Sequence, residues 1–200
     1  MKRRYLATAL LGALALSACA TAPGPVEVTR FVAPDRTAQL GQGTIFIESA
    51  PGSGEDSLEL APYKAAVAAE LVKLGYVEAP RGEASQVAQV QIERIAREPA
   101  DKRGPVSVGV GGSTGTYGSG VGLGIGINLG GGPKPQVETQ LAVMIRDKAS
   151  GQSIWEGRAE FSVAENSPLA DADESAKAMA YALFREFPGN NGETVAVGVK

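Results

Sequence analysis

The chain has 200 residues with no histidine, one cysteine and a formal net charge of −3. The missing histidine excludes an imidazole base near neutral pH and a histidine metal ligand, and one cysteine excludes an internal disulfide and a thiolate zinc site. The hydrophobic fraction of 44% and the charged fraction of 20% are typical of a globular domain, and the acidic balance argues against a nucleic-acid binder.

The N-terminus is predicted to be a lipoprotein signal peptide over residues 1–18. Three basic residues open the chain, and an apolar stretch of 11 residues follows, too short to span about 30 Å of hydrocarbon as a helix. The stretch ends at Leu16, and the run Leu16, Ser17, Ala18 and Cys19 resembles a bacterial lipobox. The resemblance implies that Cys19 carries a diacylglycerol and becomes the first residue of the mature chain. An ordinary cleavage site with a coincidental cysteine is the alternative.

A lipidated Cys19 predicts where the protein resides. Two or three acyl chains anchor a protein durably, whereas a single chain binds reversibly. The next residue is Ala20 rather than aspartate, and its resemblance to enterobacterial sorting signals implies export to the outer membrane, with the domain on the periplasmic face. The membrane is therefore the first expected partner, through the acyl chains.

Residues 19–43 are expected to be a lipidated tether. They are rich in proline and in small or polar residues, and no helical or strand period is sustained. The alternative is that residues 26–31, which alternate in polarity, form an extra edge strand.

The folded domain is predicted over residues 44–200 as a single unit. A β-branched and aromatic run predicts a strand at 44–48, and apolar residues at helical spacing predict a helix over 60–74, with Gly75 past its end. Alternation predicts further strands at 87–95 and 137–145, the latter joined by a turn to a partner strand at 155–163.

A second helix is predicted after this hairpin. Ser167 can cap its first turn, Pro168 fits the first helical position, and Pro188 ends it. Residues 194–199 can add a final strand. The order of elements predicts an α+β fold with a largely antiparallel sheet and two helices packed on one face.

A glycine-rich insert occupies residues 104–132 and holds 13 of the 26 glycines without one acidic residue. Valine, leucine and isoleucine alternate with glycine in two runs, which favours a β-hairpin or a long loop with one apolar face. A disordered insert and a contact surface are the other two interpretations, because a bare glycine face lets another molecule approach closely. The candidate contact residues are Val121, Gly122, Leu123, Gly124, Ile125 and Gly126. No nucleotide-binding signature fits the glycines.

The carboxylates of the predicted hairpin are the remaining candidates for chemistry. Glu138, Glu156 and Glu160 fall on its outward register, and paired carboxylates can act as general acid and base. Charges that pair across strands on a solvated sheet face are the favoured interpretation. Trp155 falls on the inward register and is expected in the core. We therefore expect no catalytic site, no metal site and no cofactor, and the chain is not expected to be an enzyme.

Several short stretches together resemble the bacterial lipoprotein family catalogued as domain of unknown function 4136. They are the end of the first helix at 69–76, the glycine- and valine-rich middle, the run 146–157 and the closing Phe187-Pro188. The chain departs from the pattern at Ser85-Gln86, where an aspartate would open the second strand, and it continues past Pro188. The resemblance implies an envelope lipoprotein with an α+β domain and brings no catalytic residues.

The sequence thus favours a lipid-anchored, non-enzymatic protein with a binding or structural accessory role in the cell envelope. The alternative is an accessory subunit of an envelope transport or assembly complex, with a protein partner docked on the glycine-rich segment. A hydrolase that depends on carboxylates alone is a remote third hypothesis.

Overall fold

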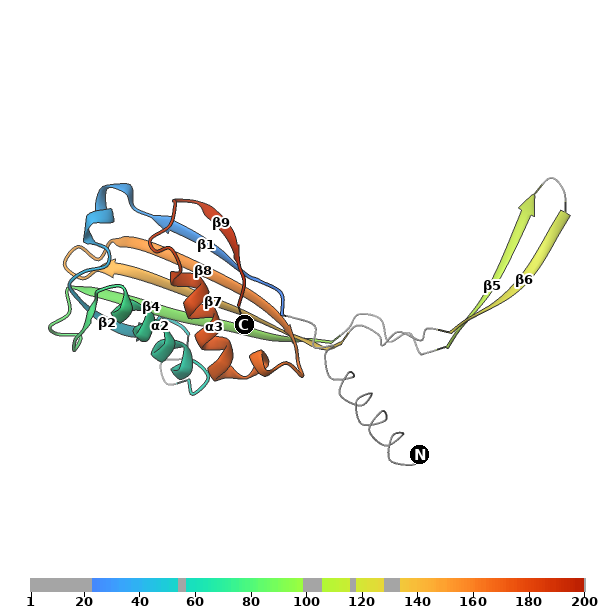
Figure 1. The fold of residues 1–200 in the computed structure, drawn as a ribbon, viewed down its shortest axis with the longest axis horizontal. Helices are drawn as coiled ribbons and strands as arrows, with labels where there is room; N and C mark the ends of the chain where they lie inside the picture. Colours follow the sequence, from blue (N-terminus) through green and yellow to red (C-terminus); the bar gives the residue numbers. More distant parts are fainter. Residues whose placement is uncertain (1–22, 54–56, 99–105, 116–117, 128–133, 200) are drawn as a thin grey trace, which may run out of the picture.

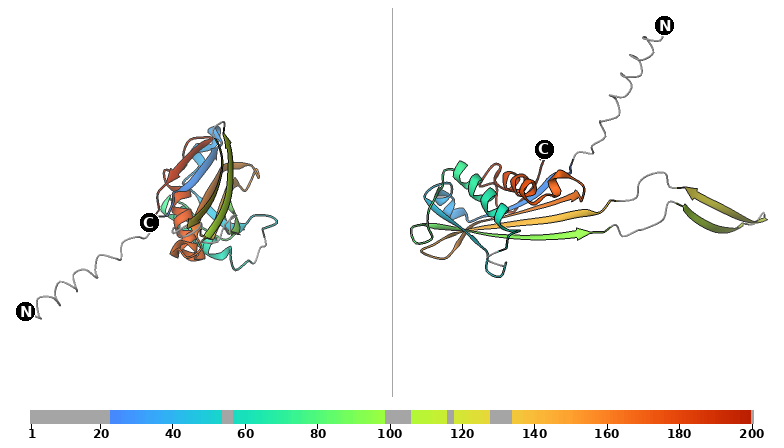
Figure 2. Two further views of the ribbon diagram at one scale, coloured as in Figure 1. Left: turned by 90° about the vertical axis from the view of Figure 1, so that its right-hand side faces the viewer. Right: turned by 90° about the horizontal axis from the view of Figure 1, so that it is seen from below.

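The computed structural model describes residues 23–53, 57–98, 106–115, 118–127 and 134–199, the stretches at 106–127 through their backbone alone. As predicted, the fold is α+β (Figure 1). A mixed, mostly antiparallel sheet of seven strands carries both α-helices on one face, and the opposite face is left uncovered (Figure 2).

The sheet has the strand order β3-β2-β4-β7-β8-β1-β9. Strand β2 runs parallel to β3 and β4, and the other neighbours pair antiparallel. The strands are β1 (Val26–Val32), β2 (Thr44–Ser49), β3 (Val77–Glu78), β4 (Gln86–Arg97), β7 (Gln136–Asp147), β8 (Ser153–Ala164) and β9 (Glu193–Val197).

The central hairpin β7–β8 confirms the alternation seen in the sequence. Leu141 and Ala159 lie directly opposite each other and are fully buried, whereas the neighbouring Arg158 is exposed. Because successive side chains of a strand point to opposite faces, one apolar residue in two gives the sheet one buried and one solvated face.

The first helix also follows its prediction. Helix α2 (Ala61–Lys73) buries Tyr63, Val67 and Leu71 against the sheet. Gly75 follows with a φ of 107°, a conformation that a side chain disfavours.

The second helix begins later than predicted. The Ser167 hydroxyl accepts a hydrogen bond from Leu169 N at 3.3 Å, but it caps the short 3-10 helix η3 (Pro168–Ala170). Helix α3 (Ala172–Phe184) has Asp171 as its N-cap, which accepts from the amide of Asp173 at 2.9 Å. A carboxylate at this end also meets the positive end of the helix dipole, which favours Asp171 as the start.

The expected tether over 19–43 is wrong for most of its length. Strand β1 lies inside the sheet between β8 and β9, and the 3-10 helix η2 (Pro34–Gln39) follows it. The alternative of a strand at 26–31 is therefore the correct one, although the strand is an interior one. The reason is burial, since Val26 and Val28 are fully enclosed on the core face.

The core is centred on the face of β8 that meets α3. Trp155 is 1% exposed, as expected for a core residue, and stacks on Phe184 with ring centroids 5.3 Å apart. Its indole N–H donates to the carbonyl oxygen of Pro188 at 2.9 Å. Gly157 lies beside the ring, where a Cβ atom would collide with Trp155 and come within 2.8 Å of Leu183 Cδ1.

A buried arginine closes the C-terminal end of α3. Arg30 is 1% exposed and lies on the core face of β1. Its Nε donates to the carbonyl oxygen of Leu183 at 3.1 Å, and its Nη2 donates to those of Ala182 and Arg185 at 3.3 and 2.7 Å. The last carbonyls of a helix lack partners within the helix and carry partial negative charge, so the cation satisfies both needs.

In the glycine-rich insert, β5 (Val106–Gly115) and β6 (Gly118–Ile127) pair antiparallel as a separate two-stranded sheet. Within the described part of the chain, none of the helices has the length and apolar character that a membrane crossing requires.

Candidate functional site

The strongest candidate for a binding site is the uncovered face of the seven-stranded sheet, which we call the open face. Both α-helices pack on the other side, so this face meets solvent (Figure 2). Its central strands are β4, β7 and β8, with β1 beside them. The outward residues of these four strands include Gln89, Gln91, Glu93, Glu138, Gln140, Ala142, Met144, Glu156, Arg158, Glu160 and Glu27.

Two depressions join into a groove along the open face. The first, of about 380 Å³, runs from Ala50 and Pro51 across the middle of β4, β7 and β8. The second, of about 560 Å³, extends to Gly24 at the start of β1. Because Glu93 and Gln140 line both depressions, the two are continuous.

Two carboxylates in the groove take part in contacts across strands. Gln140 Nε2 donates to Glu160 Oε1 at 3.0 Å, and these two residues lie directly opposite each other on β7 and β8. Arg97 Nε forms an ion pair with Glu138 Oε2 at 2.7 Å. These contacts fit the solvated, cross-paired sheet face that the sequence favoured.

A third carboxylate marks the β2 side of this face. Glu48 accepts hydrogen bonds from Gln89 Nε2 at 3.0 Å and from Arg81 Nε at 2.8 Å. Burial favours a raised pKa, but the two hydrogen bonds and the charge of Arg81 outweigh it, so the pKa of Glu48 is lowered. Glu48 is therefore an ionised acceptor at neutral pH rather than a proton donor.

The open face offers hydrogen-bonding groups more than reactive ones. Amides and carboxylates line it, together with Arg158 and the apolar side chain of Met144. Among the described residues, no group of three or more carboxylate or cysteine side chains could hold a metal ion. The arrangement suits recognition of an extended polar ligand through many weak contacts.

The departure at Ser85-Gln86 has a structural role. Gln86 is buried at the start of β4, where its Oε1 accepts from the Tyr76 hydroxyl at 3.2 Å. Its Nε2 donates to the carbonyl oxygen of Gln39 at 2.8 Å. The amide thus binds the end of η2 through its nitrogen and Tyr76 through its oxygen, and a carboxylate cannot make both contacts because it lacks a donor.

The structure describes some of the site residues predicted from the sequence and not others. Leu16, Ser17, Ala18 and Cys19 lie outside the described residues. The candidate contact residues from Val121 to Gly126 lie in β6, where each pairs with a position of β5. Sequence reasoning placed Glu138, Glu156 and Glu160 on the outward register but missed the groove, which only the alignment of neighbouring strands creates.

The open sheet with two helices on one face places this protein in the α+β class. Residues 32–189 match the family described as Domain of unknown function (DUF4136). The match covers well over half of the chain, so the chain belongs to this family, as its resemblance to domain of unknown function 4136 predicted.

One curated relative is an uncharacterized protein of Zymomonas mobilis, 37% identical over 62 residues. The match covers 31% of this chain and 23% of that protein. The chain therefore aligns with less than a quarter of this relative.

Two solved structures are among those that match the chain. A PDZ domain protein from Parabacteroides distasonis has a TM-score of 0.50 at 16% identity, covering 94% of this chain and 42% of that one. The PelC dodecamer from Paraburkholderia phytofirmans has a TM-score of 0.46 at 12% identity, covering 80% of this chain and 94% of that one.

Proposed function

We propose that the protein is a lipid-anchored component of the bacterial cell envelope, held in the outer membrane with its domain facing the periplasm. It acts there by binding or structural support rather than by catalysis. The observation that carries the proposal is the position of Cys19, which ends a signal-peptide pattern and lies close before the first strand.

The short link between Cys19 and β1 supports this arrangement. Only residues 20–25 separate the two. Fully extended, such a segment spans at most about 25 Å, so an acylated Cys19 keeps the domain near the bilayer surface. Gly24 lines one end of the groove, and the groove therefore opens toward the membrane end of the domain.

The open face supports a binding role. Its carboxylates at Glu138 and Glu160 are engaged with Arg97 and Gln140, and the chain has no histidine to serve as a base. Where charges are already paired within the protein, a surface binds a partner through complementary shape and many hydrogen bonds. Such binding suits a structural or accessory role in the envelope.

Lipid anchoring is tested by metabolic labelling with palmitate. The wild-type chain is expected to incorporate the label and Cys19→Ser is expected to lose it, whereas Ser17→Ala, which keeps the small residues before the cysteine, serves as the matched control. Label retained in Cys19→Ser, or none in the wild type, would contradict the anchor.

The proposed location in the outer membrane is tested by separating inner and outer membranes on a density gradient. The wild-type chain is expected in the outer membrane, and Ala20→Asp is expected to move it to the inner membrane. Wild-type protein in the inner-membrane fraction would contradict the proposed location.

The binding role is tested with a photo-crosslinker at Met144, in the groove, and at Tyr181, an exposed residue of α3, as the control. A partner that crosslinks from Met144 and not from Tyr181 supports recognition by the open face, and equal patterns from both positions contradict it. A hydrolase activity that disappears in Glu156→Gln would contradict the non-enzymatic role.

A second candidate function is an accessory subunit of an envelope transport or assembly complex that docks through the glycine-rich segment. The hairpin of β5 and β6 stands as its own sheet, which favours this alternative. Deleting 105–132 and repeating the crosslinking separates the two functions, because unchanged partners would remove the second.

A further inference from the structure

The strand register gives the glycine-rich hairpin two unlike faces. Val106 lies opposite Ile127, Val108 opposite Ile125, and Val110 opposite Leu123. Since residues directly opposite each other in an antiparallel pair share a face, one face collects the valine, leucine and isoleucine positions.

The intervening pairs form the second face. Ser107 lies opposite Gly126, Gly109 opposite Gly124, and Gly111 opposite Gly122. In this part of the hairpin, the large aliphatic residues therefore pair with one another, and the glycines pair with glycine or serine. A shift by one residue would mix the two sets, so the pairing itself specifies an apolar side and a bare side.

Such a hairpin is stabilised when its apolar face is buried against another surface. A two-stranded sheet alone is at best marginally stable in water, and each interior glycine weakens it further. The two-stranded sheet shares no strand pairing with the described strands of the seven-stranded sheet, and it is drawn beyond the end of that sheet (Figures 1 and 2).

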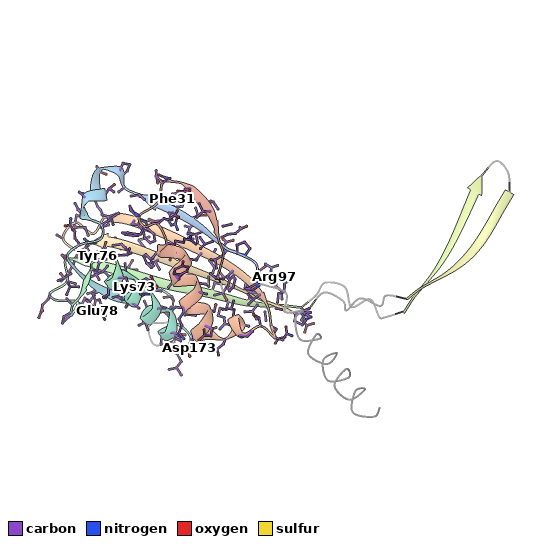
Figure 3. The ribbon with its side chains drawn as sticks, in the orientation of Figure 1. Phe31, Lys73, Tyr76, Glu78, Arg97 and Asp173 are labelled. Atoms are coloured by element: carbon purple, nitrogen blue, oxygen red, sulfur yellow. The ribbon has the colours of Figure 1, made fainter. Side chains whose placement is uncertain are left out.

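The membrane end of the domain is also where the hairpin is attached. The chain leaves the sheet at Arg97 and returns at Gln136, and Arg97 lies at that end of the sheet (Figure 3). Gly24, which precedes β1, lines the same depression as Arg97. The segment toward Cys19 and the segment toward the hairpin therefore start from one place.

Charge at the base of the hairpin favours a lipid surface. No charged residue occurs from Gly104 to Pro133. Asp101, Lys102 and Arg103 precede this stretch and Lys134 follows it, so three cations and one acid flank it directly. An uncharged apolar ribbon with cations beside its base matches the order of layers in a bilayer, where anionic headgroups flank hydrocarbon.

We propose that the hairpin of β5 and β6 is a second membrane contact, which places its valine, leucine and isoleucine face in the bilayer surface beside the acyl anchor. The inference rests on the proposed function in two respects, the lipid anchor and the identity of the membrane. The affinity itself is a property of the hairpin, so it is measurable on a chain that carries no lipid.

The experiment uses residues 20–200 without Cys19 and flotation with vesicles of phosphatidylethanolamine and phosphatidylglycerol. The unmodified chain is expected to float with the vesicles. The double variant Val108→Asp/Ile125→Asp, changed at one pair of the apolar face, is expected to lose at least about tenfold in partitioning. Ser107→Asp, on the other face of the same strand, is the matched control and is expected to stay within about threefold of the unmodified chain.

Each outcome decides the proposal. An unmodified chain that does not float while its Trp155 near-ultraviolet signal shows a folded domain overturns it. An equal loss of partitioning in Val108→Asp/Ile125→Asp and in Ser107→Asp also overturns it, because the two faces would then be equivalent. Oligomers that form without vesicles and are abolished by Val108→Asp/Ile125→Asp, in a chain that does not float, would assign the apolar face to a second copy instead. Lipidation is judged by palmitate label alone, so failure of the anchor and failure of the hairpin are distinct results.

Discussion

Replacing Arg30 by methionine tests whether this buried cation holds α3 onto the sheet. Its guanidinium makes three hydrogen bonds to carbonyl oxygens at the end of the helix. Burial lowers the pKa of Arg30, and the charges of Glu193 and Glu186 raise it in part. An arginine stays protonated throughout the usual working range of pH, so the effect of the substitution is expected to be independent of pH there.

The magnitude follows from the hydrogen bonds. Each bond from a charged donor contributes about 1.5–3 kcal/mol, and two of the three, to Ala182 and Leu183, are buried. Burial of the methionine side chain recovers about 1.5 kcal/mol, and the three bonds are not additive. Arg30→Met is therefore expected to lower the free energy of unfolding by about 3–5 kcal/mol.

Urea denaturation of residues 20–200, followed by Trp155 fluorescence, measures this loss. The indole stacks on Phe184 at the end of α3 and so reports on the region that Arg30 secures. Arg158→Met on the open face is the matched control and is expected to change stability by less than about 0.5 kcal/mol. If Arg30→Met proves too unstable to fold, Arg30→Lys is the second variant. It keeps the charge but not the several N–H donors of the planar guanidinium, and it is expected to lower the free energy of unfolding by about 1–3 kcal/mol. A loss below about 1 kcal/mol in Arg30→Met would refute the reasoning.

Three further substitutions test other contacts. Gly157→Ala is expected to lower stability by about 1–3 kcal/mol and to change the near-ultraviolet signal of Trp155, because the new methyl group collides with the ring. Gly75→Ala is expected to cost about 1–2 kcal/mol in thermal unfolding, since its φ is positive and a Cβ would lie 2.7 Å from the Gly41 carbonyl oxygen. Glu48→Gln is expected to cost at most about 1 kcal/mol near neutral pH, measured by urea denaturation across a pH series.

The sign of the Glu48 effect follows from its lowered pKa. A carboxyl that is more acidic in the folded state contributes stability above its unfolded pKa and loses it as pH falls through the folded pKa. The difference between wild type and Glu48→Gln should therefore shrink on acidification below the usual value of 4.5. A difference that grows on acidification would contradict the assigned hydrogen bonds. Gly198→Ala, where no atom lies within 4 Å of the added Cβ, is the control for both glycine substitutions.

Local periodicity predicted the central hairpin because it reports which side of an element is apolar. The outward position of Glu156 and the inward position of Trp155 followed from the same alternation. Asp171 was missed as the start of α3, since Ser167 with Pro168 is an equally good signal within a few residues. Both residues act as caps, Ser167 of η3 and Asp171 of α3.

The sequence by itself determined most of the helices and strands, the uncharged glycine-rich insert and the place of the only cysteine at the end of a signal pattern. Tertiary structure decided that β1 is an interior strand and that Arg30 is a buried cap. It also decided that the open face is a groove. The physical reason is that alternation fixes the faces of a strand, whereas its neighbours depend on pairings between distant segments. Val28, for example, gains its burial from Ala159 and Val195 on either side, far along the chain.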